Sequence, residues 1–142
     1  AINNMLDKIR KFDLKKAGYG GCIIGLFNIM IHMFVIFQII PYTWVNGGRT
    51  ASQVAAQEIS VSSIIMTVIN ILIALVATQI IPIKLNRIAG ITLSAFLILT
   101  LPFSFIGIIQ QFLGTMFEKI VMSVVTIIGF CFDTRIAFEK RW

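Results

Sequence analysis

The feature that most constrains the fold is Gly20–Pro41, a run of 22 residues without a charged side chain. A helix rises ~1.5 Å per residue, so this run measures ~30 Å, the thickness of the hydrocarbon core of a bilayer. Three further apolar runs follow it along the chain. The pattern predicts an all-α integral membrane protein that crosses the membrane four times as a four-helix transmembrane bundle.

The composition excludes most other classes. Apolar residues make up 58% of the 142 residues and charged residues 13%, about half of what a soluble domain needs to cover its surface. A net charge of +6 is compatible with nucleic-acid binding. The basic residues, however, stand at the ends of apolar runs, where they set membrane topology. We therefore expect the lipid bilayer as the partner and no nucleic acid.

The chain divides into three parts. Residues 1–19 combine basic residues with apolar residues at helical spacing, which predicts a short amphipathic segment on the cytoplasmic membrane surface. The bundle is predicted over 20–138 and the cytoplasmic tail over 139–142. Thr50 followed by Gln53 matches a capping box and places a helix start near Ala51. The expected spans are about 20–41, 59–81, 88–109 and 117–138.

The distribution of positive charge predicts the orientation. Ten of the 12 Lys and Arg residues lie in the N-terminal segment, the 82–88 loop and the C-terminal region from Arg135 onward, and only Arg49 and Lys119 lie on the other side. The positive-inside rule then puts both termini in the cytoplasm. We expect a multi-pass protein of the plasma membrane, of the small bacterial type.

Polar residues inside the first two spans form the first candidate site. Asn28 and His32 share one face of the first helix, and Thr67 and Asn70 lie on a small, polar stripe of the second. We expect Asn70 to lie close to His32. These groups would either bind a ligand or proton in the bundle core or form hydrogen bonds between packed helices.

The second candidate site gathers charges at the outer interface. Arg49, Glu58 and Glu118 would form a headgroup-binding mouth or an acid–base pair, or they would remain solvated charges at helix ends. The uncharged part of the fourth span, 120–132, is too short to cross the hydrocarbon. We therefore expect Glu118 or Asp133 to be tucked against protein with a partner, and Asp133 to pair with Arg87.

The remaining chemistry is sparse. Two cysteines without CxxC spacing and a single histidine provide neither a zinc site nor a dithiol pair, so we expect no metal and no cofactor. We find no internal repeat, phosphate loop or catalytic motif. Gly21 and Gly25 form a GxxxG, which allows a second helix to approach closely, either within the bundle or in a homodimer.

These observations favour a non-catalytic membrane protein of accessory, immunity or resistance type. It would bind a lipophilic small molecule or another membrane protein. One alternative is a small transporter subunit that works as an oligomer, although no acidic residue is expected in mid-span. The other is an intramembrane lipid-modifying enzyme that uses Glu58 or Glu118 as acid or base and Arg49 to hold a headgroup.

Overall fold

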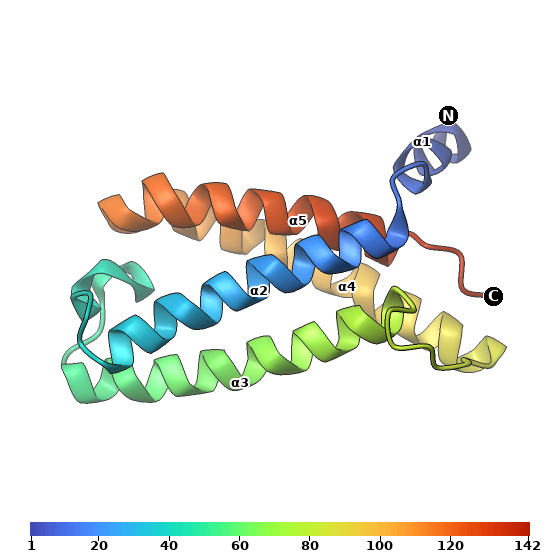
Figure 1. The fold of residues 1–142 in the computed structure, drawn as a ribbon. Helices are drawn as coiled ribbons and strands as arrows, with labels where there is room; N and C mark the ends of the chain where they lie inside the picture. Colours follow the sequence, from blue (N-terminus) through green and yellow to red (C-terminus); the bar gives the residue numbers. More distant parts are fainter.

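The computed structural model covers residues 1–142 and is entirely helical (Figure 1). Each long helix is apolar along its length because its side chains face either lipid or another helix. The α-helices are α1 (Ile2–Arg10), α2 (Leu14–Ile36), α3 (Gln53–Ala77), α4 (Arg87–Phe112) and α5 (Ser123–Ala137). Two short 3₁₀ turns, η1 (Tyr42–Trp44) and η2 (Asn46–Gly48), and a π-helical turn, η3 (Glu118–Met122), complete it.

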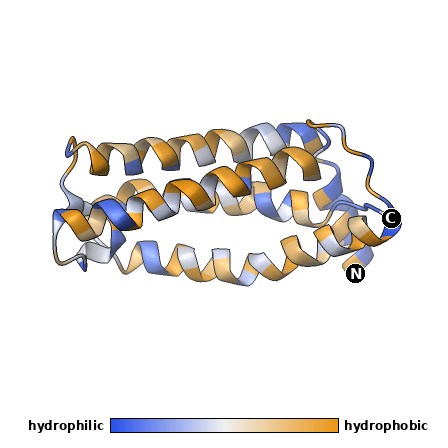
Figure 2. Cartoon of the chain, turned by 90° about the horizontal axis from the view of Figure 1, so that it is seen from below, coloured by the Kyte–Doolittle hydropathy of each residue, from blue (hydrophilic) through white to orange (hydrophobic).

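Four helices are long and apolar enough to cross a membrane: α2, α3, α4, and α5 together with the π turn before it. Only 19 of the 142 residues are buried, and most large apolar side chains point outward, the reverse of a soluble protein. Figure 2 shows this apolar colouring along the long helices, with hydrophilic colour mainly near their ends. The predicted all-helical fold is confirmed, and its four helices of spanning length and apolarity suggest a multi-pass membrane protein.

The four long helices form an open row in the order α3, α2, α5, α4. Helix α2 packs on both α3 and α5, and α5 packs on α4, but α3 and α4 barely touch, which leaves a seam between them. Both termini and the 78–86 connection lie at one end of the bundle, here called the terminal end (Figure 1). The 37–52 loop and the 113–117 turn lie at the other, here called the loop end.

The N-terminal ends of α2 and α3 differ from the prediction. Helix α2 begins at Leu14, six residues early, because Asp13 caps it: the Asp13 carboxylate accepts from Lys16 N at 2.8 Å. Residues 14–19 therefore belong to the first span and not to the surface segment. Helix α3 is capped by Ser52 rather than Thr50, through a 3.2 Å bond from Ala55 N.

The C-terminal ends of α2 and α3 share a motif that the expected boundaries missed. Both helices stop before the sequence Gln-Ile-Ile-Pro, which occurs at 38–41 and again at 79–82. Gln38 and Gln79 each take a left-handed conformation with φ of 59°. Ile39 N then bonds Phe34 O, and Ile80 N bonds Leu75 O, which is the Schellman pattern. The sequence analysis did not use this recurring tetrapeptide, which marks both helix ends.

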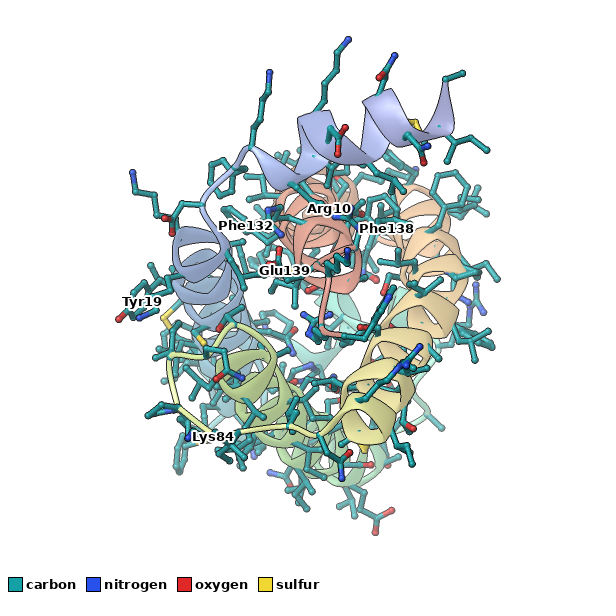
Figure 3. All side chains as sticks on the ribbon, turned by 90° about the vertical axis from the view of Figure 1, so that its right-hand side faces the viewer. Arg10, Tyr19, Lys84, Phe132, Phe138 and Glu139 are labelled. Carbon is teal, nitrogen blue, oxygen red and sulfur yellow. The ribbon has the colours of Figure 1, made fainter.

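At the terminal end, α1 lies across the end of α5 (Figure 3). Arg135 is 6% exposed, and its Nε donates to Phe12 O at 2.6 Å while Nη2 donates to Arg10 O at 3.2 Å. Arg10 Nε donates back to Phe138 O at 2.8 Å. We call these contacts the Arg135 clamp.

Arg135 also forms the one ion pair of the structure, 2.7 Å from Glu139. The expected pair of Asp133 and Arg87 is therefore wrong. The guanidinium of Arg141 donates to Ser94 Oγ and to Ala77 O, both at 3.1 Å, so the tail joins the ends of α3 and α4. Burial lowers the pKa of Arg141, and the nearby Glu139 carboxylate offsets part of this shift.

Candidate functional site

A cavity of about 300 Å³ opens at the loop end, between α2, the 45–49 loop, the end of α4 and the π turn. Its wall contains four of the seven residues predicted from the sequence: Asn28, His32, Arg49 and Glu118. These four come from segments far apart in the chain. The other lining residues are Ile31, Val45, Asn46, Gly47, Gln110, Gln111 and Met122.

Glu118 holds the loop to the bundle. It is 6% exposed, and its Oε1 accepts hydrogen bonds from Gly47 N at 2.8 Å and Thr115 N at 3.3 Å. The Thr115 hydroxyl lies 3.2 Å from the same oxygen and donates its one proton to Trp44 O at 2.5 Å. The expectation that a carboxylate of the fourth span is tucked against protein is confirmed for this residue. Two backbone amides therefore bind one carboxylate oxygen, which fixes Glu118 to the loop and to the turn before it.

Gly47 is required in this arrangement for two reasons. Its φ is +66°, a left-handed conformation that glycine adopts without strain. A side chain there would also meet Arg49, because an added Cβ would lie 3.1 Å from Arg49 Nε. The exposed Arg49 side chain therefore lies over the loop, next to the amide that donates to Glu118.

The polar groups of this cavity are incompletely satisfied. Arg49 has no carboxylate partner. In addition, the buried atoms Asn46 Nδ2, a donor, and Gln111 Oε1, an acceptor, have no hydrogen-bond partner. Buried polar atoms are normally paired, so an orphan donor and an orphan acceptor in one wall indicate a missing partner. The sequence marks Asn46 only as a turn residue, and nothing in its pattern pointed to this role.

The polar residues of α2 and α3 form hydrogen bonds between the helices. His32 Nδ1 lies 3.0 Å from Ser60 Oγ, and Asn28 Nδ2 donates to Thr67 Oγ1 at 3.0 Å. The predicted proximity of Asn70 to His32 is wrong. Because α2 begins early and ends early, His32 lies near the loop end of its helix, opposite Ser60, whereas Asn70 lies further toward the terminal end.

Two further cavities continue from the loop end into the bundle. One of about 340 Å³ shares Asn28 and Met122 with the loop-end cavity and extends to Asp133. The other, of about 380 Å³, lies along the seam between α3 and α4 and shares Asn70, Ser104 and Asp133 with it. Asp133 is exposed, lines both cavities and has no hydrogen-bond or ion-pair partner, so the α3–α4 seam contains an unpaired acidic side chain that the sequence analysis did not expect.

Other predicted residues stay apart. Glu58 is exposed and lines none of the cavities, so the structure does not join it to Glu118 as an acid–base pair. Lys119 is exposed as well. No group of three or more His, Cys, Asp or Glu side chains is placed to hold a metal ion.

Comparisons with protein-family models, curated proteins and solved structures find no match for this chain. The cavities and the polar groups that line them are therefore the features of the molecule that bear on its function.

Proposed function

We propose that this protein binds an amphiphile with an acidic headgroup in the loop-end cavity, as a non-catalytic accessory, immunity or resistance factor of the plasma membrane. In this proposal both termini face the cytoplasm and the loop end faces outward. The observation that carries the proposal is the unpaired Arg49 guanidinium beside the orphan atoms Asn46 Nδ2 and Gln111 Oε1.

The chemistry of these three groups selects the ligand class. A guanidinium and an amide donor suit the oxygens of a phosphate or carboxylate, and charge-assisted bonds of this kind are the stronger ones. The free acceptor of Gln111 suits a hydroxyl or protonated acid. The alkyl tail of the ligand would lie in the surrounding lipid, along the apolar outer faces of α2 and α4. Glu118 is taken up by the loop, which supports binding rather than catalysis.

The test is binding of dodecyl phosphate to the purified protein in a neutral detergent, measured by calorimetry against dodecanol. We expect dodecyl phosphate to bind at least tenfold more tightly, and Arg49→Gln to lose about tenfold in affinity, the size of one charge-assisted hydrogen bond. Lys119→Gln is the matched control, because it removes an exposed cation outside the cavity, and it should change affinity less than twofold. Equal losses for the two variants, or equal binding of the alcohol, would refute the proposal.

A second candidate, a transporter subunit that works as an oligomer, is favoured by Asp133. Carriers commonly use an acidic group at membrane depth, and Asp133 faces cavities that follow the α3–α4 seam. A second copy would cover that seam. The GxxxG face is not free for this purpose, because Gly25 packs against Ile71 within the bundle.

Disulfide cross-linking in membranes tests this candidate in a background with Cys22→Ser and Cys131→Ser. Phe103→Cys lies on the seam and is 75% exposed, so it should form a covalent dimer. Leu26→Cys is also exposed, at 59%, but lies on α2 outside the cavities, and it should stay monomeric. Absence of dimer at Phe103, or equal dimer at both positions, would argue against an oligomer of this kind.

A further inference from the structure

A second apolar groove, unrelated to the loop-end cavity, lies at the terminal end between α1 and α5. Its volume is about 430 Å³. The floor is formed by Phe130 and Phe132 of α5, and the opposite wall by Ile9 and Phe12. The rings of Phe12 and Phe132 lie 6.3 Å apart, in contact across the base of the groove. The groove shares no lining residue with the loop-end cavity, and only Phe130 with the bundle cavity that extends to Asp133.

The Arg135 clamp gives this groove fixed walls. Two carbonyls at the end of α1 are bound by one buried guanidinium, and Arg10 returns a bond to Phe138 O. Figure 3 shows Arg10 directed toward the end of α5, next to Phe138 and Glu139. These hydrogen bonds fix α1 to the end of α5, so α1 is part of the bundle and is not attached to the membrane surface alone.

The charges around the groove are of one sign. Lys8 lines it, is exposed and has no carboxylate partner. Arg135 also lines it, but its guanidinium is already engaged by Glu139 and the two carbonyls. No aspartate or glutamate lines the groove. A free ammonium at the rim of an apolar slot is complementary to a phosphate that carries an alkyl chain.

The depth of the groove matches a lipid. Phe130–Phe132 precede Ala137, the last residue of α5, by five to seven positions, which is ~7–10 Å along the helix. Amphipathic helices bury their apolar faces ~5–10 Å into the boundary between headgroups and acyl chains. The rim with Lys8 therefore lies at headgroup level when the floor lies among the first methylenes.

We propose that this groove is a binding site for an anionic glycerophospholipid of the leaflet that the terminal end faces. One acyl chain lies on Phe130 and Phe132, and the phosphate pairs with Lys8. The site is independent of the ligand proposed for the loop end. Helix α1 then forms part of a specific lipid-binding site, rather than attaching to the membrane only through its positive charge.

Native mass spectrometry of the purified protein tests the site, with phosphatidylglycerol and phosphatidylcholine of identical chains. We expect one phosphatidylglycerol to be retained in clear preference to phosphatidylcholine. Lys8→Gln should reduce that preference about fivefold, the contribution of one cation at a membrane surface. Lys15→Gln removes the same charge from a nearby exposed position outside the groove, and it should change the preference less than twofold.

Two variants of Cys131, which is exposed and lines the groove, separate the slot from the charge. Cys131→Trp fills the slot and should abolish retention of the tightly held lipid, whereas Cys131→Ser should leave it unchanged. A phosphatidylglycerol with a photoactivatable acyl chain should cross-link to the peptides that contain Phe12 and Phe132. Equal retention of both lipids, equal effects of Lys8→Gln and Lys15→Gln, or full retention in Cys131→Trp would each overturn the proposal.

Discussion

Two buried charges of opposite sign attach the ends of the molecule to its bundle. Glu118 accepts from backbone amides of the loop end, and Arg135 donates to backbone carbonyls of the terminal end. Both are satisfied mainly by groups other than an opposite charge. Each of these hydrogen bonds satisfies a buried charge and a backbone group at the same time, and both would cost free energy if left unpaired.

Glu118→Ala should therefore destabilise the protein. The variant leaves Gly47 N and Thr115 N without their acceptor, and a buried unpaired donor costs about 1–3 kcal/mol. We expect that loss in the free energy of unfolding, measured by thermal denaturation in detergent, and a smaller loss for Glu118→Gln, which keeps an oxygen acceptor. Glu58→Ala, at an exposed site, should stay within about 0.5 kcal/mol of the parent. Equal stability of Glu118→Ala and Glu58→Ala would show that the loop contacts contribute nothing.

Arg135→Ala should release α1. Trypsin cleavage after Lys8 or Lys11 then becomes about tenfold faster, because the hydrogen bonds that dock the helix are lost. Arg135→Lys should behave similarly, since one ammonium does not reproduce the forked geometry that reaches Phe12 O, Arg10 O and Glu139 together. The rate of appearance of the shortened chain on a gel measures the effect. An unchanged rate would mean that α1 is held by its apolar face alone.

At the scale of the helices, the capping residues decide where each span ends. Gln38 and Gln79 hold a left-handed position that usually belongs to glycine. The Gln79 side chain compensates by donating to Val76 O at 3.2 Å and to Ile83 O at 3.1 Å. Gln38 has no such side-chain bond in the structure, so the two ends have the same backbone but different support.

Gln38→Gly should stabilise the protein by about 0.5–1 kcal/mol, because a left-handed residue with a Cβ is strained by roughly 1–2 kcal/mol and glycine partly offsets that gain through its freedom in the unfolded chain. Gln79→Gly should give a smaller gain or none, since it also removes two side-chain hydrogen bonds. Melting temperatures of the two variants in one detergent provide the comparison. A larger gain at position 79 would contradict the role given to the Gln79 side chain.

The spans themselves were predictable, since the length and apolarity of a run are properties of the local sequence. Their ends were not, because glutamine is a weak signal for a left-handed cap and Asp13 could be read as part of a surface helix. For the candidate site, the sequence identified several of the residues but not how they are arranged. Asn28, His32, Arg49 and Glu118 were found by residue type, but the unpartnered Asn46 amide and the position of Asp133 on the seam depend on how distant segments meet. The register that pairs His32 with Ser60 likewise follows from packing.

At the scale of the molecule, the two proposed binding sites lie at opposite ends of the helices. The loop end carries the cavity with Arg49, and the terminal end carries α1, the Arg135 clamp and most of the positive charge. A seam between α3 and α4 runs between them and is lined by Asn70 and Asp133. The orientation of these ends across the membrane remains a prediction from the distribution of Lys and Arg.

Labelling of intact cells with a membrane-impermeant maleimide tests that orientation in the background without native cysteines. Thr43→Cys at the loop end should be labelled within minutes, and Ile83→Cys at the terminal end only after the membrane is permeabilised. Both positions are exposed and neither removes a basic residue. The opposite labelling pattern would place the termini outside and reverse the assignment of both ends.

The Arg135 clamp also has a consequence for biosynthesis. The clamp joins residues 123 positions apart, so the ribosome synthesises α1 and the first three long helices before it reaches Arg135. At a synthesis rate of roughly 5–20 residues per second, the N-terminal helix waits of the order of ten seconds for Arg135. During that interval α1 lacks the hydrogen bonds that dock it, so α1 docks only after α5 has been synthesised.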